Sequence, residues 1–191
     1  MFFGRLDPCT GKLFWGNILL VVCSAFYLAW WTAAFRPKGA SKGFGTNLLL
    51  LAAIAAGIGA VVFMAQGIST APHPVALFPS GLILWGGIVV YLILLAVTAL
   101  LLKRQVTTEL FLIIGWAMLE LSAIDALYGA GRTAFPAAVF LIVVIAVAVV
   151  VSMVCYLLYY RLEQTAGYID GMIPLIVDAV AMACVAVATV I

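Results

Sequence analysis

The stretch "PAAVFLIVVIAVAVVVSMVCYLLYY", residues 136–160, runs for 25 residues without one charged side chain. A helix that crosses a hydrocarbon core of about 30 Å needs roughly 20 apolar residues, because each residue adds about 1.5 Å. The stretch is therefore predicted to be a transmembrane helix. The whole chain has the same character, with 68% hydrophobic residues, 8% charged residues and a mean hydropathy of +1.31. This composition is typical of an integral membrane protein.

Five further apolar stretches are long enough to cross a bilayer. The six predicted spans are 14–35, 47–68, 82–102, 109–130, 136–160 and 171–191. Backbone groups in lipid must bond within their own segment, and the stretches lack the alternation of barrel strands, so all six are predicted to be helices. We expect an all-α, polytopic membrane protein, a compact bundle of six transmembrane helices with short loops. Residues 1–191 would then form a single transmembrane domain.

The basic residues predict an orientation in the cell membrane. The first, third and fifth loops share one side and carry six of them: Arg36, Lys38, Lys42, Lys103, Arg104 and Arg161. The opposite side carries three: Arg5, Lys12 and Arg132. Because cytoplasmic loops are enriched in Lys and Arg, both termini are predicted to lie outside.

Several classes of function have no support in the sequence. The formal charge of +2 is too small to indicate nucleic-acid binding. The four cysteines are scattered without a C-x-x-C pair, and His73 is the single histidine, so no metal and no cofactor is expected. No nucleophile motif or nucleotide loop stands in a suitable context. An enzyme is therefore the least supported reading, and no catalytic residue is proposed.

Three acids lie inside predicted spans: Glu120, Asp125 and Asp178. An ionised acid at the bilayer centre costs about 2.5–3.5 kcal/mol, so such residues usually face the bundle interior or water and mark functional sites. Counted from Glu109 and from Gly171, Asp178, Glu120 and Asp125 are expected about 10, 16 and 24 Å deep. An aspartyl-protease dyad is disfavoured, since its carboxyls must lie about 3 Å apart.

Asp125 and Glu120 differ in their local surroundings. Tyr128 and Arg132 share a helix face with Asp125, so a phenol and a guanidinium could neutralise it. Glu120 has no cationic neighbour in its own helix, so it must stay protonated or find a partner elsewhere. We expect Glu120 to be the central residue of an ion or substrate pathway, with Asp178, Asp125 and Tyr128 beside it.

Asp178 follows Pro174 by four residues. Proline has no N–H, so it can leave the carbonyl of Asp170 without its usual donor and open the helix beside an acid. The sequence is equally compatible with an ordinary helix start, with a proline and then an acid in a favourable dipole field.

Polar and aromatic residues form a stripe on the first span. Asn17, Ser24, Tyr27 and Trp31 recur at intervals of seven, three and four residues, and so share one helix face. The stripe could line a polar cavity opposite Glu120, which adds Asn17 and Tyr27 to the expected pathway. The aromatic residues near Arg36 are also explained by an interfacial belt.

The second span carries small residues four apart, in the sets Ala52/Ala56/Ala60, Ala53/Gly57 and Ala55/Gly59. In the last span, Ala179/Ala183 and Ala181 repeat the pattern. Small residues let neighbouring helices approach closely in lipid, so we expect helix contacts on these faces.

Two functions remain in view. The chain is predicted to be a small transporter or channel-like protein that moves a proton, an ion or a small solute by means of intramembrane carboxylates. The alternative is a non-catalytic membrane subunit or scaffold that docks partner transmembrane helices. The expected partners are the lipid bilayer and either further copies of the chain or a partner membrane subunit, with no nucleic acid.

Overall fold

The computed structural model of the chain describes residues 7–37, 39, 43–72, 75–101, 108–159 and 161–190. Several residues used in the sequence predictions lie outside this part of the chain: Arg5, Lys38, Lys42, His73, Lys103 and Arg104. The predicted span ends at residues 102, 160 and 191 lie outside it as well.

All regular elements of the described residues are helical. In chain order they are α1 (Pro8–Ala34), α2 (Phe44–Thr70), α3 (Leu82–Ala96) with the π-helical turn η2 (Val97–Leu101), α4 (Thr108–Gly129), α5 (Phe135–Tyr159), α6 (Gln164–Asp170) and α7 (Met172–Ala188). They provide six helices that are long and apolar enough to cross a membrane. The predicted all-α bundle of six membrane-spanning helices is confirmed, and the chain is a multi-pass membrane protein.

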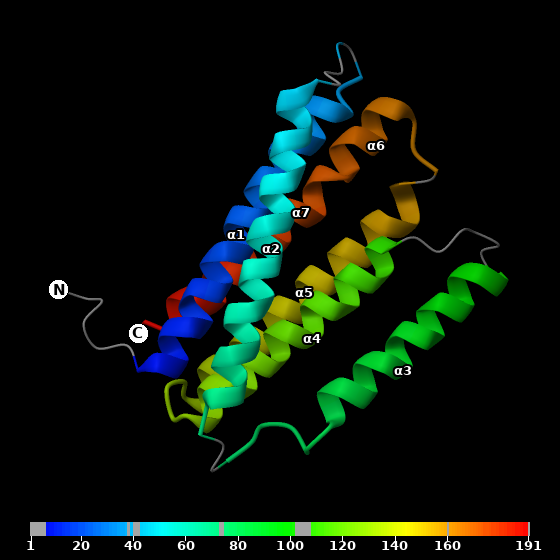
Figure 1. The fold of residues 1–191 in the computed structure, drawn as a ribbon. Coiled ribbons are helices and arrows are strands. Elements are labelled where there is room, and N and C mark those ends of the chain that lie inside the picture. The colour runs from blue at the N-terminus through cyan, green and yellow to red at the C-terminus, as the bar shows by residue number, and fades with distance from the viewer. Residues whose placement is uncertain are drawn as a thin grey trace.

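Five helices pack in a ring, and the sixth lies outside it (Figure 1). Around the ring, α1 contacts α2, α2 contacts α4, α4 contacts α5, α5 contacts α7, and α7 returns to α1. We call the end where α1 finishes and α6 begins the vestibule end, and the end where α1 begins and α7 finishes the terminal end. Successive spans alternate in direction. The polar site described below is built from α1, α4, α5 and the α6–α7 pair.

Small residues of α2 let it pack closely against α1. The sequence predicted part of this contact face of α2. Ala53 and Ala60 are buried, and the space beside Gly57 is filled by the Cys23 sulfur, which lies 3.3 Å from where a Cβ would stand. A Cβ on Gly67 would lie 2.8 Å from the Leu13 side chain. The contact face of α2 therefore includes the predicted Ala53/Gly57 pair and extends to Ala60 and Gly67. Ala55, of the predicted Ala55/Gly59 pair, is exposed instead.

The sixth span begins earlier than predicted. The segment "RLEQTAGYIDG" was expected to be a loop, but it contains α6, and the apolar span extends from Gln164 to Ala188 with an interruption at Gly171. Isolated glycines are tolerated in a helix, and Pro174 occupies the first turn of α7, where a missing N–H costs little. Counted from Gln164, Asp178 is about 21 Å along the helix axis and not about 10 Å. Asp178 is therefore farther from the start of its span than the sequence predicted.

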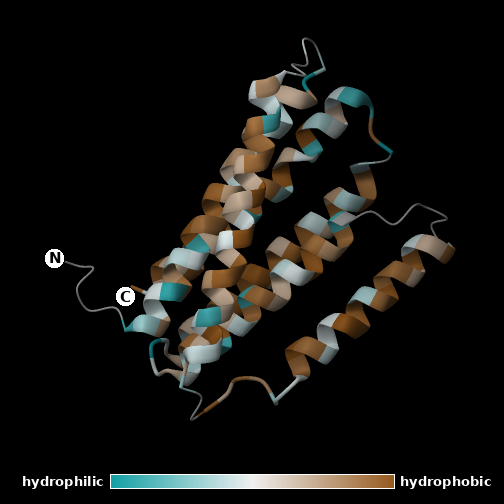
Figure 2. Cartoon of the chain, in the orientation of Figure 1, coloured by the Kyte–Doolittle hydropathy of each residue, from teal (hydrophilic) through white to brown (hydrophobic). Residues whose placement is uncertain are grey.

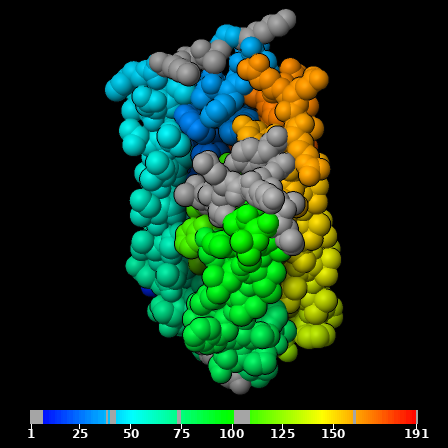
Figure 3. Space-filling view, turned by 90° about the vertical axis from the view of Figure 1, so that its right-hand side faces the viewer, coloured from blue at the N-terminus to red at the C-terminus, as the bar shows by residue number. Residues whose placement is uncertain are grey.

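The remaining helix, α3, packs mainly on α4 and has no buried residue among those described. Its contact includes a close approach of Met118 to Gly87 and an edge-to-face pair of Tyr91 with Phe111. Figure 2 shows apolar colouring along almost all of α3, and Figure 3 shows α3 lying on the outside of the molecule between α2 and α5. Such a helix suits lipid, because hydrocarbon tails solvate its exposed side chains.

Two contacts fix the terminal end. Asp7, just before α1, forms an ion pair with Arg132 in the α4–α5 turn. That turn closes α4 with Gly131 at a φ of 68°, while Arg132 N–H donates to the Leu127 carbonyl and Gly131 N–H to the Tyr128 carbonyl. This pattern is a Schellman motif, which needs a left-handed residue and so favours glycine.

The packing of Gly67 makes a testable prediction. Gly67→Ala should lower the free energy of unfolding by about 1–3 kcal/mol, because the new methyl group would overlap Leu13. Gly59→Ala is the matched control in the same helix, since its Cβ would meet Leu19 at an ordinary 3.5 Å. Alanine favours helix, so the control should be neutral or slightly stabilising. Thermal unfolding of both variants in one detergent measures the difference, and equal melting temperatures would contradict the packing argument.

Candidate functional site

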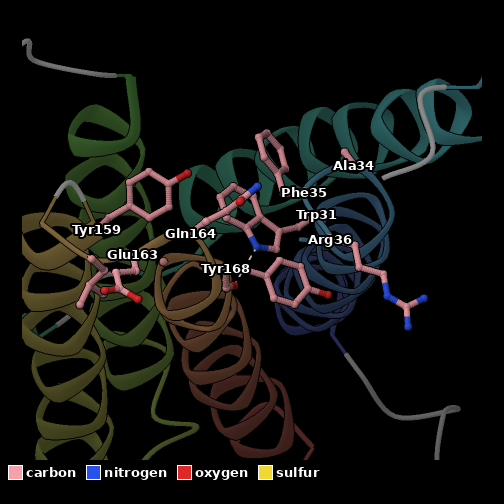
Figure 4. Close-up of a pocket in the computed structure, with 10 residues that line it drawn as sticks. Trp31, Ala34, Phe35, Arg36, Tyr159, Glu163, Gln164 and Tyr168 are labelled. Atoms are coloured by element: carbon pink, nitrogen blue, oxygen red, sulfur yellow. Dashed lines mark hydrogen bonds between the residues drawn. The ribbon is translucent and has the colours of Figure 1, made fainter. Parts of the chain in front are cut away.

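A pocket of about 420 Å³ opens at the vestibule end, between the end of α1, the end of α5 and α6 (Figure 4). We call it the vestibule. It is lined by Trp31, Ala34, Phe35, Arg36, Tyr159, Leu162, Glu163, Gln164, Gly167 and Tyr168. Figure 4 shows four aromatic rings gathered around it, with the Arg36 guanidinium pointing away from them. The vestibule is thus an open pocket lined mainly by aromatic rings, with the polar side chains of Arg36, Glu163 and Gln164 also in its wall.

Trp31 forms the floor of the vestibule. Its Nε1–H donates to the Tyr168 carbonyl at 3.1 Å, and its ring stacks on Phe35 with centroids 4.4 Å apart. Gly171 leaves room for the indole, because a Cβ there would lie 2.4 Å from Trp31 Cζ2. The indole therefore occupies the point at which α6 gives way to α7.

A second cavity of about 300 Å³ lies beyond Trp31, between α1, α4, α5 and the α6–α7 pair, and it opens to the surface beside Glu109 and Leu112, which are exposed. We call it the inner cavity. Trp31 and Tyr159 line both spaces, and their rings meet edge to face with centroids 5.9 Å apart. The other residues of its wall are Leu20, Cys23, Ser24, Tyr27, Glu109, Leu112, Ile113, Trp116, Ser152, Cys155, Tyr156, Asp170, Gly171, Pro174, Leu175, Asp178 and Met182. The aromatic pair thus stands between the vestibule and the inner cavity.

Two carboxyls in the wall come from either side of the break at Gly171. Asp178 of α7 accepts a hydrogen bond from the Ser152 hydroxyl of α5 at 3.1 Å. Asp170, the last residue of α6, is only 8% exposed, and its Oδ2 has no hydrogen-bond partner. Asp170 and Asp178 therefore line the same cavity from either side of Gly171, whose own backbone angles stay helical.

Glu120 lies one turn along α4 from Trp116, which lines the cavity, but Glu120 itself does not line it. Its side chain is 0% exposed, and neither carboxyl oxygen has a hydrogen-bond partner. The Trp116 indole N–H lies close enough to act on the Glu120 carboxyl, and so does the charge of Asp178. Glu120 is thus a fully buried acid that lies behind the residues lining the inner cavity.

The polar stripe of the first span divides between two environments. Ser24, Tyr27 and Trp31 line the inner cavity, whereas Asn17 does not. Asn17 is fully buried, donates from Nδ2 to the Leu13 carbonyl at 3.0 Å, and has an unpartnered Oδ1. Asn17 and Glu120 are therefore both buried polar groups beyond the cavity, each with unused bonding capacity.

Asp125 has partners that the sequence did not suggest. Its Oδ1 accepts hydrogen bonds from the backbone N–H groups of Leu77 and Phe78, at 2.7 and 3.3 Å. The expected neutralisation by Arg132 is wrong, because Arg132 pairs with Asp7. Asp125 instead ties the segment before α3 to α4, and this contact between residues 47 and 48 positions apart leaves no trace in helix spacing.

Tyr128, also expected beside the pathway, lies at the end of α4. Its ring packs edge to face on Phe135 at a centroid distance of 6.3 Å, and it is not part of either cavity wall. Tyr128 and Asp125 thus belong to the terminal end of the molecule, away from the vestibule.

Several lining residues were missed. Glu109, Glu163 and Asp170 were not among the predicted pathway residues, yet they line the vestibule or the inner cavity. On α5, the wall residues are Ser152, Cys155, Tyr156 and Tyr159. Their spacing of three, one and three residues on one face of an otherwise aliphatic helix was a signal that could have located them.

Removal of the Asp125 carboxyl should loosen the segment before α3. Asp125→Ala would leave the N–H groups of Leu77 and Phe78 without their acceptor, which costs about 1–3 kcal/mol if no water replaces it. Asp125→Asn keeps an oxygen at the same place and should restore most of the stability. Amide hydrogen exchange of residues 75–80 measures the effect. Unchanged exchange in Asp125→Ala would contradict the anchoring role.

Comparisons with known proteins assign no function to this arrangement. No protein-family model, no curated protein and no solved structure matches the chain. Any functional conclusion therefore rests on the geometry and chemistry of the two cavities.

Proposed function

We propose that the chain is a small membrane transporter or channel-like protein that moves a proton, an ion or a small solute. One observation carries the proposal: a cavity of about 300 Å³ lies between four of the membrane-spanning helices and has Asp178 in its wall. Acids within spans are expensive in lipid and usually serve ion or substrate pathways. Here the acid is placed where a solute could reach it.

The pathway begins at the vestibule, passes the pair of Trp31 and Tyr159, and reaches Asp178 in the inner cavity. Beyond that point the bundle is closed, but buried polar side chains continue in Glu120 and Asn17. A molecule that is hollow at one end and packed at the other resembles one state of alternating access. In this proposal, Glu120 holds a proton or relays it between the cavity and the closed half.

The scaffold alternative has weaker support. It relied on small-residue faces that could dock partner helices, but Ala53, Gly57, Ala60 and Gly67 are used within the chain against α1. The exposed apolar surface of α3 is explained by lipid alone. A function as a docking subunit would therefore have to use other surfaces.

The transport proposal is tested by flux into liposomes that contain the purified protein. We expect movement of protons, sodium, potassium or an organic cation above that of protein-free liposomes. Asp178→Asn and Glu120→Gln should each reduce that flux by about tenfold or more, because each removes a carboxyl from the pathway. Asp125→Asn should keep the wild-type flux, since Asp125 lies outside both cavity walls.

If none of these solutes moves, the proposed transport is wrong. If flux is present but both carboxyl variants retain it fully, transport does not use the proposed pathway. Folding of each variant is checked by its melting temperature in detergent.

The vestibule end is proposed to face the cytoplasm of a cell membrane, with both termini outside, because it carries Arg36 and Arg161. In a chain whose four cysteines are replaced by serine, Ala134→Cys should react with a membrane-impermeant maleimide on intact cells. Thr165→Cys should react only after the cells are opened. Both positions are exposed, so the reverse labelling pattern would invert the proposed orientation.

A further inference from the structure

We propose that the inner cavity binds a small organic cation with an apolar body, such as a quaternary or protonated amine, with its charge beside Asp170 and Asp178. Transport of this cation rests on the proposed function, whereas its binding does not. Four features of the cavity carry it: the sign of its charges, an unpartnered carboxyl, its aromatic wall and its lack of a metal-binding cluster.

The wall of the inner cavity carries charge of one sign. Asp170 and Asp178 place two carboxyls in it, and the described residues of this wall include no lysine, arginine or histidine. A cavity with low-dielectric walls and one sign of charge concentrates ions of the opposite sign. The charge pattern therefore favours a cation over a neutral solute or an anion.

Asp170 adds an independent indication of a ligand. The residue is 8% exposed and lines the cavity, its carboxyl lies beside the Cys155 thiol, and its Oδ2 has no hydrogen-bond partner. A buried polar atom without a partner is costly and needs a water, an ion or a ligand to satisfy it. An ammonium group in the cavity would supply the missing interaction, and it could share its charge with Asp178.

The rest of the wall fits an apolar and aromatic body. Five rings face the space, from Tyr27, Trp31, Trp116, Tyr156 and Tyr159. Aromatic faces attract cations through their quadrupoles, with tryptophan the strongest, and the attraction increases when the site excludes water. A volume of about 300 Å³ lies at the lower end of the range for pockets that hold small organic molecules.

A bare metal ion fits less well. Hard cations need several oxygen ligands that converge on one point. Within the described part of the chain, no group of three or more His, Cys, Asp or Glu side chains is close enough to hold a metal ion. The two carboxyls of Asp170 and Asp178 are better matched to a larger cation that needs fewer oxygen ligands.

An amino-acid zwitterion is disfavoured by the same wall. Its carboxylate would need a basic partner or a set of N–H donors, and Arg36, the basic residue among the described lining residues, belongs to the wall of the vestibule and not to that of the inner cavity. Figure 4 shows its guanidinium directed away from the pocket. The ligand is thus cationic overall, without an anionic group.

The test compares three probes of similar ring size and different charge: benzyltrimethylammonium, benzyl alcohol and phenylacetate. Isothermal titration calorimetry on the purified full chain in detergent should show saturable binding of benzyltrimethylammonium. Benzyl alcohol should bind at least about tenfold more weakly, because it lacks the charge, and phenylacetate should not bind. This comparison uses the wild-type protein, so it does not depend on any variant folding.

Variants then locate the site. Asp170→Asn and Asp178→Asn should each weaken benzyltrimethylammonium binding by about tenfold or more, since each removes one charge contact. Asp125→Asn is the matched control, because it removes a carboxylate that lies outside both cavities, and its affinity should equal that of the wild type.

Equal affinity for benzyl alcohol and benzyltrimethylammonium would overturn the inference, as would unchanged binding in both cavity variants. The outcomes also separate this inference from the transport proposal. Binding of the cation without any flux in liposomes would support the site and refute transport. Flux of protons or metal ions without binding of benzyltrimethylammonium would support transport and refute this ligand class.

Discussion

The contact of the Trp31 indole with Gly171 organises the polar half of the molecule. A side chain at Gly171 would overlap the indole, so the absence of a Cβ lets α1 lie against the point where α6 meets α7. The same indole bonds to the Tyr168 carbonyl and meets the ring of Tyr159. It therefore joins three parts of the bundle and separates the vestibule from the inner cavity.

The acidic residues at the two ends of the bundle differ in whether their carboxyl oxygens have partners within the protein. Near the terminal end, Asp7 pairs with Arg132 and Asp125 accepts two backbone N–H groups, so both carboxylates have partners within the protein. Near the cavities, Asp170 and Glu120 retain oxygens without partners. Since a bilayer offers no water to satisfy such groups, the first pair serves stability, and the second pair is the natural place to look for solute and proton binding.

Lipid explains why the bundle is uneven. α3 exposes aliphatic side chains along most of its length and packs mainly on α4. In water such a surface would be a liability, but hydrocarbon tails are as apolar as leucine and give no force that would bury it. Close packing is found instead where small residues permit it, as between Leu13 and Gly67 on α1 and α2. Packing of this kind shapes the ring that encloses the inner cavity.

The sequence by itself determined the fold class and the number of spans, because the length of an apolar run and the demand for internal backbone bonds in lipid are local properties. It also drew attention to Asp178 and Tyr27, which reach the cavity wall, since a buried acid and a polar stripe can be read along one helix. Only the tertiary structure decided that Asp125 anchors a distant loop and that Asp170 belongs to the cavity. Those outcomes depend on which helices become neighbours and at what register, and helical periodicity within one span holds no information about either.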